Sequence, residues 1–320
     1  MKDFYQPMKV MAIIVTYGQR AHLLARVVEA AIKEGVEKFV IVDNDSSPES
    51  KKKIESIYRK YFPKIHLVSN NLNEGSAGGF SKGLKTAVKY SKYNFFWLLD
   101  DDNMPQKQSL EKLKIAYSYL GNNYKNILTS SRASSRRQDL EALVLGKKRK
   151  YDDNNICGWT IINWIRSFFQ TIKSEKTNYF MLRNEIAPYG GLFLNKRVLH
   201  KVGYPKEKLF VYADDHDWSY RMTKCGFSIS LCSESKIEDI DNSKVSISKN
   251  KIYYQTRNHT WLSKQYITNK FAFFINCLAY FCLYICLKHF LKCLFSPNYK
   301  NIPYLIKVKA FIDGFRLKID

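Results

Sequence analysis

The stretch "FFWLLDDDNMP", Phe95–Pro105, joins an apolar run directly to three consecutive carboxylates, Asp100, Asp101 and Asp102. The apolar residues predict a buried strand, which places the acidic triplet at the carboxyl end of that strand. Like charges side by side repel, and a buried carboxylate is costly unless a partner neutralises it. A divalent cation bound by the triplet is one such partner.

The segments around this stretch alternate between strand and helix patterns. The predicted strands are short, apolar and largely β-branched, at 10–16, 38–42, 65–69 and 95–99. The predicted helices have apolar residues at helical spacing, over 21–33, 48–61 and 80–90. This alternation predicts an α/β fold with a mostly parallel sheet flanked by helices.

Polar residues follow the ends of four predicted strands. They are Thr16, Asp43, Asn73 and the acidic triplet. Because ligands in α/β folds collect at the carboxyl ends of strands, we expect these side chains to converge on one site.

The acidic triplet favours a metal ion. If strand geometry persists, Asp100 and Asp102 point the same way. Two such carboxylates can hold Mg²⁺ or Mn²⁺, which in turn bridges two phosphates. The alternative is an acidic turn that caps a helix expected to begin near 106–109. The apolar strand before the triplet and a Gly-rich loop further upstream favour the metal.

The Gly-rich stretch "NEGSAGGFSKGL" runs over 73–84 and is expected to form a turn over 73–79 before a helix. Backbone amides at a helix N-terminus suit phosphate, and glycine permits close approach. The stretch matches neither the P-loop nor the dinucleotide-binding fingerprint, so alone it is weak evidence.

A second acidic cluster lies in "FVYADDHDWSYR", where Asp214, Asp215 and Asp217 surround His216. One of these carboxylates is a candidate general base, and Arg221 is the expected i,i+4 partner of Asp217 if the segment is helical. The alternative is a helix N-terminus with acidic capping residues.

The composition indicates a polyanionic partner in a reducing compartment. There are 52 Lys and Arg against 29 Asp and Glu, for a formal charge of +23. Nucleic acid, an anionic membrane surface and a nucleoside diphosphate all fit this charge. Seven cysteines without CxxC spacing favour free thiols, and the N-terminus has no signal-peptide pattern, so a cytoplasmic location is expected.

The segment 271–287 carries no charge over 17 residues. It is at the short end of what spans a bilayer, and its Phe and Tyr content suits an interfacial helix or re-entrant hairpin. A buried core helix is the alternative. We therefore expect a main domain over 1–265 and a helical, membrane-associating region over 266–320.

Four blocks stand in one order along the chain: "VTYGQR", "VDNDSS", "NEGSAGGFSKGL" with "LLDDDNMP", and "GGLFLNKRVLHKVGYPKEKLFVYADDHDWSYRMTKCGFSI". Together they resemble the family-2 inverting glycosyltransferases of the GT-A fold, over roughly residues 8 to 260. The Gly-rich block and the triple Asp are most similar to galactofuranosyltransferases and rhamnosyltransferases of bacterial cell-surface polysaccharide.

The resemblance implies a nucleotide-sugar site. Thr16 and Asp43 would hold the nucleotide base and ribose. The stretch from Asn73 to Gly79, including Gly78, would line the nucleotide or donor sugar.

The resemblance also implies the reacting groups. Asp100 and Asp102 would coordinate the Mn²⁺ or Mg²⁺ ion on the donor pyrophosphate, and Asp215 would be the catalytic base. Gly191, the second glycine of a pair, would lie near the sugar and acceptor. Arg257, in "YYQTRN", matches a family block after the catalytic helix and is expected in the donor site.

The chain departs from the family in one respect. Many relatives have a His downstream of the base that completes the metal site, whereas "SESKIEDID" over 233–241 has none. Glu238, Asp239 or His259 are the candidate replacements.

The implied activity is metal-dependent, inverting transfer of a sugar, galactofuranose or rhamnose, from a UDP-sugar or dTDP-sugar donor. The acceptor would be a polyprenyl-diphosphate-linked or growing oligosaccharide at the inner face of the cell membrane. An alternative is a catalytically inactive relative that scaffolds an assembly. Nucleic-acid binding is disfavoured, because the chain has no recognition module and acidic clusters without a metal repel phosphate.

Overall fold

The computed structural model describes residues 8–132, 139, 148, 150–169, 180–241, 248–287, 290, 294–295 and 302–319. The chain divides into two compact units. The first comprises Met1–Lys150, Glu175–Glu207 and Asp215–Ser243, and the second Tyr151–Ser174, Lys208–Asp214 and Lys244–Asp320. The second unit takes in more of the chain than 266–320, and a domain boundary after residue 265 stays a prediction.

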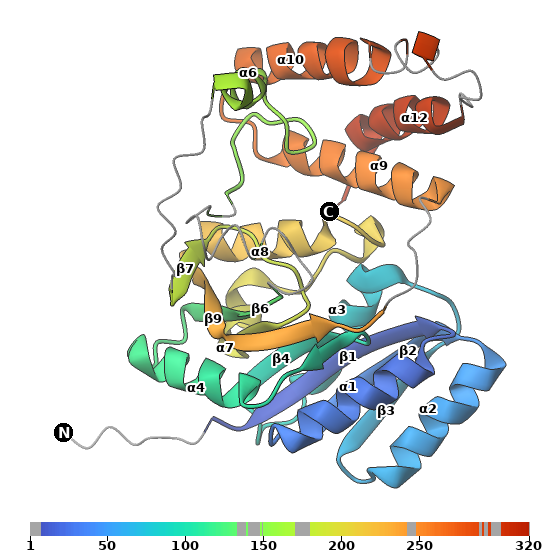
Figure 1. Cartoon of the computed structure of the whole chain (residues 1–320), viewed down its shortest axis with the longest axis vertical. Coiled ribbons are helices and arrows are strands. Elements are labelled where there is room, and N and C mark those ends of the chain that lie inside the picture. Colours follow the sequence, from blue (N-terminus) through green and yellow to red (C-terminus); the bar gives the residue numbers. More distant parts are fainter. Residues whose placement is uncertain are drawn as a thin grey trace. The chain divides into compact units, whose positions relative to one another are not determined.

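The first elements of the chain confirm the predicted strand–helix order (Figure 1). They are β1 (Val10–Gly18), α1 (Ala21–Lys33), β2 (Lys38–Ser46), α2 (Pro48–Lys60), β3 (Ile65–Asn70), α3 (Gly75–Ala87) and β4 (Phe95–Asp100). They are followed by β5 (Asn103–Pro105), α4 (Ser109–Tyr119), β6 (Asn126–Ser131), β7 (Met181–Asn184), β8 (Leu192–Asn195), α7 (Arg197–Val202), the 3-10 turn η1 (Glu207–Leu209), α8 (Asp214–Lys224) and β9 (Ser228–Asp239).

In the described part of the chain these strands form one nine-stranded sheet, in the order β3-β2-β1-β4-β8-β6-β9-β5, with β7 beside β9. The half containing β3, β2, β1 and β4 is parallel, as predicted. The other half is mixed, because β8 runs antiparallel to both β4 and β6. The sheet is therefore mostly parallel only where strands and helices alternate along the chain.

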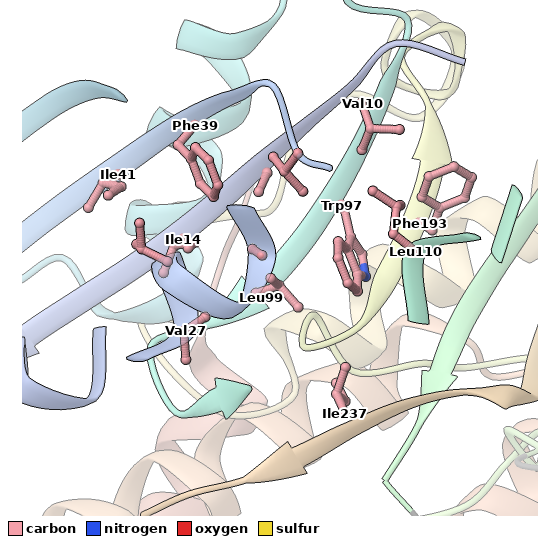
Figure 2. Close-up of a cluster of buried hydrophobic side chains, with 14 of the residues drawn as sticks. Val10, Ile14, Val27, Phe39, Ile41, Trp97, Leu99, Leu110, Phe193 and Ile237 are labelled. Atoms are coloured by element: carbon pink, nitrogen blue, oxygen red, sulfur yellow. The ribbon is translucent and has the colours of Figure 1, made fainter. Parts of the chain in front are cut away.

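Two apolar layers cover the sheet, and β1 shows why. Its alternate residues Val10, Ala12 and Ile14 pack on the face covered by α1, α2 and α4. Its other residues Met11, Ile13 and Val15 pack on the face covered by α3, α7 and α8. Figure 2 shows the first of these layers, with side chains from β1, β2 and β4. A continuous apolar strand is thus buried on both faces, as its sequence predicts.

The Gly-rich stretch differs from its prediction. The helix α3 begins at Gly75 instead of Phe80, so Gly78 and Gly79 lie inside a helix and not in a turn. A Cβ at Gly79 would lie 2.6 Å from Val15 Cγ1, and one at Gly83 would lie 2.7 Å from Ile13 Cγ2. These two glycines therefore let α3 approach β1 closely. Close packing is thus an explanation of the Gly-rich stretch other than a phosphate-binding turn.

The second unit is helical in its described residues. Its helices are α6 (Ile161–Phe169), α9 (Lys249–Gln265), α10 (Lys270–Ala279), the π-helical η2 (Tyr280–Leu287) and α12 (Ile302–Arg316). Its small core contains Ile156, Phe273, Tyr280, Ile285 and Phe311. Among the described helices, the stretch Lys270–Leu287 is long and apolar enough to cross a membrane, a criterion that a soluble core helix also meets.

Candidate active site

The carboxyl ends of three parallel strands bring the predicted site residues together. Thr16 of β1 pairs with Asp43 of β2, and Val15 pairs with Asp100 of β4. Neighbouring parallel strands lie about 4.8 Å apart, so the polar residues at these ends form one edge. Of the strand ends expected to converge, those of β1, β2 and β4 therefore lie side by side.

Asp101 is the buried member of the acidic triplet. Its carboxylate accepts hydrogen bonds from Thr16 Oγ1 at 2.7 Å and Arg20 Nε at 2.8 Å. Burial raises the pKa of Asp101 above the usual range of an aspartate, although Arg20 and Thr16 oppose this shift. The Thr16 hydroxyl is itself buried, so its observed partner is Asp101, and its contact with a nucleotide stays a prediction.

Arg20, in the turn between β1 and α1, explains how the triplet is tolerated. Its guanidinium bonds Asp101, lies 2.7 Å from Asp102 Oδ2 and lies 2.5 Å from Asp241 Oδ2. Three carboxylates thus share one cation whose fixed fork of donors suits several acceptors at once. This residue was not identified as a site residue from the sequence, although it lies in the quoted "VTYGQR" block.

A third potential metal ligand lies beside Asp102. Asn103 Nδ2 donates to Asp102 Oδ1 at 3.0 Å and to Asp239 Oδ1 at 2.9 Å, and Asn103 pairs with Asp239 across β5 and β9. Asp239 was one candidate for the missing histidine, and the structure brings it to the acidic cluster. His259, another candidate, belongs to the second unit.

The cluster also contains a buried cation. Arg132 Nη1 lies 3.6 Å from Asp239 Oδ1 and 3.9 Å from Asp100 Oδ2. The Arg132 side chain is buried, so its charge acts on these carboxylates with little screening by solvent. It offsets part of the negative charge at the cluster.

The Gly190-Gly191 pair borders the same carboxylates. A Cβ at Gly190 would overlap Asn103 Oδ1 and lie 2.6 Å from Asp100 Oδ2. Gly191 has a φ of +89°, which L side chains rarely adopt. Both positions therefore favour glycine, and Gly190 lies next to the predicted metal ligand Asp100. Contact of Gly191 with a sugar stays a prediction.

The donor atoms of the cluster fit a hard divalent cation. The side chains of Asp100, Asp102 and Asp239 are 37%, 23% and 24% exposed, so all three are reachable. In the described ranges no group of three Asp, Glu, His or Cys is arranged to hold an ion by itself. Mg²⁺ characteristically uses one or two carboxylates together with substrate phosphates, and metal binding by these carboxylates stays a prediction.

The remaining predicted nucleotide residues have local structural partners. Asp43 is buried and its Oδ1 accepts from Ser46 N at 2.9 Å, which fixes the turn after β2. Asn73 Oδ1 accepts from Gly75 N at 2.9 Å, at the start of α3. Both lie on the sheet edge that carries the triplet, and their contacts with a ligand stay predictions.

The two candidate bases in α8 have different surroundings. Asp217 is fully buried and lies 2.9 Å from Arg221 Nε, the predicted i,i+4 pair. Arg221 also donates to the carbonyls of Val202 and Tyr204, so the pair anchors α8 to the loop after α7. Asp215 is only partly buried. The buried pair assigns Asp217 a structural role and makes Asp215 the accessible carboxylate.

Arg257 lies in α9 of the second unit. Its Nη2 donates to the Leu209 carbonyl at 3.1 Å, and its guanidinium lies 4.8 Å from the ring centre of Tyr254. These contacts engage the guanidinium with protein groups, and its predicted contact with the donor is untested.

The fold is that of the GT-A glycosyltransferases. Mannosyltransferase PcManGT from Pyrobaculum calidifontis, solved with GDP-Man and Mn²⁺, aligns at TM-score 0.55 and 13% identity over 98% of this chain and 87% of that one. GalNAc-T7, solved with UDP, GalNAc and Mn²⁺, aligns at TM-score 0.56 and 15% identity over 79% of this chain and 48% of that one. At these identities the likeness concerns the fold.

The sequence comparisons match part of the chain to a known family. Residues 11–118 match the model of glycosyl transferase family 2. Galactofuranosyltransferase GlfT1 of Mycolicibacterium smegmatis (strain ATCC 700084 / mc(2)155) is 23% identical over 227 residues, 70% of this chain and 68% of that protein. The chain therefore carries a glycosyl transferase family 2 domain and is a nucleotide-sugar glycosyltransferase.

The Arg20 network predicts a pH-dependent loss of stability. We expect Arg20→Gln to lower the free energy of unfolding by about 3 kcal/mol at pH 8, because buried carboxylates lose their cation. The loss should be smaller at pH 5. A carboxyl whose pKa folding raises favours the folded state below that pKa, so Asp101 can take up a proton in place of the missing charge.

Urea unfolding at the two pH values measures this effect. Arg59→Gln is the matched control, since Arg59 forms an exposed i,i+4 pair with Glu55 and should change stability by less than about 0.5 kcal/mol. An equal loss at pH 5 and pH 8 would show that Asp101 is not the group left uncompensated.

Proposed function

We propose that this enzyme transfers galactofuranose from UDP-galactofuranose, with inversion, to a lipid-linked or growing glycan acceptor. The observation that carries the proposal is the reachable cluster of Asp100, Asp102 and Asp239 at the strand ends. Its first two members lie within the residues that match the glycosyl transferase family 2 model. The similarity to a galactofuranosyltransferase over 70% of the chain supports the choice of sugar. A dTDP-rhamnose donor is the competing assignment from the sequence.

Different residues act on the leaving group and on the nucleophile. Asp100 and Asp102, with Asp239 adjacent, would hold Mn²⁺ or Mg²⁺, which when bound neutralises charge on the departing nucleoside diphosphate. Asp215 takes the proton from an acceptor hydroxyl as that oxygen forms a bond to the anomeric carbon. The bond to the nucleoside diphosphate breaks on the opposite side, which inverts the configuration without a covalent enzyme intermediate.

The base in α8 gives a direct test. Asp215→Asn should retain nucleotide binding and lower the transfer rate by about 10²- to 10⁴-fold, because the amide cannot accept the proton. Asp217→Asn is the control, because it weakens the buried pair with Arg221. It should lower the free energy of unfolding and have little effect on the rate constant of the folded fraction. Transfer and unfolding are both measured on the full chain. Retention of most turnover by Asp215→Asn would contradict the assignment.

The nucleotide site predicts a preference for uracil or thymine. The buried carboxylate of Asp43 can accept a hydrogen bond from the ring N3–H of these bases, an atom that cytosine lacks. We expect UDP or dTDP with Mn²⁺ to raise the melting temperature, and GDP or CMP to have little effect. A thermal-shift series with the four nucleotides checks this, and a greater shift with UDP than with dTDP favours galactofuranose. A clear preference for GDP would contradict both the assignment of Asp43 to the base pocket and the proposed donor.

The second unit supports docking on the inner face of the cell membrane, where a lipid-linked acceptor resides. Phe271, Phe274 and Leu278 repeat at helical spacing on α10 and are 75%, 60% and 52% exposed. In α6 of the same unit, Ile162 and Ile165 are also exposed. Exposed aromatic and aliphatic side chains on a chain of charge +23 suit an anionic lipid surface.

The exposed face of α10 predicts vesicle binding. Replacing Phe271, Phe274 and Leu278 by Ser should weaken binding to vesicles containing anionic lipid by at least about tenfold, since each apolar side chain loses a site in the interface. The matched control replaces the exposed Phe62, Leu72 and Tyr119 of the first unit by Ser and should bind as the wild type does. Added salt should weaken the wild-type binding. Equal binding by both triple variants would place the membrane contact elsewhere.

A further inference from the structure

The segment directly before α8 has an unusual backbone. Phe210, Tyr212 and Ala213 have φ angles of +67°, +65° and +63°, in the left-handed region that residues with a Cβ rarely adopt. Such a backbone persists only where its surroundings hold it, and residues of this kind cluster at functional sites. Ala213 precedes the proposed base Asp215 by two residues.

One side chain of α9 holds this segment. Asn258 is completely buried, and its amide nitrogen lies 2.6 Å, 2.7 Å and 2.9 Å from the carbonyl oxygens of Leu209, Val211 and Tyr212. Three carbonyls from four consecutive residues therefore converge on one donor group. The positive φ angles of Phe210 and Tyr212 lie within this same stretch.

Arg257 sets the orientation of that amide. Its Nε donates to Asn258 Oδ1 at 2.8 Å, so the NH₂ group of Asn258 faces the three carbonyls. Its Nη2 adds a second contact to the Leu209 carbonyl. Arg257 and Asn258 together therefore present N–H donors to the carbonyl groups of the segment before α8.

The position of α9 is fixed in turn by α12. A Cβ at Gly314 would lie 2.5 Å from the Arg257 carbonyl oxygen and 2.6 Å from Thr260 Cβ, so the two helices touch at the Arg-Asn pair. Tyr253 Oη donates to Asp313 Oδ2 at 2.8 Å beside this contact. The contacts of Arg257 and Asn258 with the segment 209–213, which we call the clamp, are therefore backed by α12.

We infer that Asn258 and Arg257 are positioning residues that hold the strained segment 209–213 and thereby set the entry of the chain into α8 and the placement of Asp215. The inference rests on the proposed function for the role of Asp215, but the clamp itself does not. It also gives Arg257 a role other than the donor contact expected from the sequence. A base displaced by about 1 Å can lose about 10²-fold in rate.

Hydrogen exchange tests the clamp without any activity. In Asn258→Ala, amide exchange over 209–214 should be at least about tenfold faster, because the carbonyls lose their shared donor. Asn276→Ala is the matched control: Asn276 is also a buried amide of the second unit, bonded to Ile161 N and the Asn154 carbonyl. It should leave exchange over 209–214 unchanged. Equal exchange in Asn258→Ala and the wild type overturns the clamp.

A double-mutant cycle tests the link to the base. Asn258→Ala alone should lower kcat by about 10- to 10²-fold with little change in the KM for the donor. In an Asp215→Asn background it should cost no further rate, because the group being positioned is already absent. A further loss of the same size in that background overturns the positioning role and leaves only a general structural one.

Arg257→Lys and Gly314→Ala keep the inference testable if Asn258→Ala fails to fold. Arg257→Lys keeps the charge but loses the fork that orients Asn258, and Gly314→Ala adds a methyl group against the Arg257 carbonyl. Each should speed exchange over 209–214 and lower kcat more than it raises the donor KM. A raised donor KM with unchanged kcat in Arg257→Lys would instead indicate that Arg257 contacts the donor. If Asp215→Asn keeps its turnover while Asn258→Ala speeds exchange, the base assignment fails and the clamp stands.

Discussion

The bonds between Arg20 and the acidic strand end are the constraint on which the site depends. Three consecutive aspartates follow a strand that is buried on both faces, and the backbone forces the middle one inward. Asp101 can occupy that position because Thr16 and Arg20 bond it. Arg20 then reaches Asp102 and Asp241 as well, so one cation from the β1–α1 turn keeps the carboxylates together. Without it, the repulsion among these carboxylates would lack its compensating charge.

Burial separates the two roles of carboxylate within each acidic run. In the triplet, Asp101 is buried and paired, while Asp100 and Asp102 stay reachable. In α8, Asp217 is buried and paired with Arg221, while Asp215 is partly exposed. In both runs a paired carboxylate fixes the backbone so that its neighbours are presented at a defined place. Adjacent acidic residues of the same type thus serve structure and chemistry separately.

Local pattern was sufficient to predict the first half of the fold. The continuous apolar run of β1 and the helical spacing of α1 and α2 are properties of consecutive residues, and the structure confirms them. The start of α3 was predicted wrongly, because glycine was interpreted as a turn former while Gly79 and Gly83 permit close packing on β1. Asp239 was named only as one of several candidates. Its place beside Asn103 is set by pairing of β5 with β9, over 130 residues apart in sequence, which no local pattern encodes.

The central claim is that the carboxylate cluster forms a metal site that is completed by the diphosphate of the donor. Calorimetric titration of UDP into the full chain, with and without Mn²⁺, tests it most directly. The incomplete protein ligand set predicts that Mn²⁺ tightens UDP binding by at least about tenfold, and that Asp102→Asn removes this gain while leaving metal-free UDP binding unchanged. The same UDP affinity in the wild-type chain with Mn²⁺ and with a chelator would contradict the account.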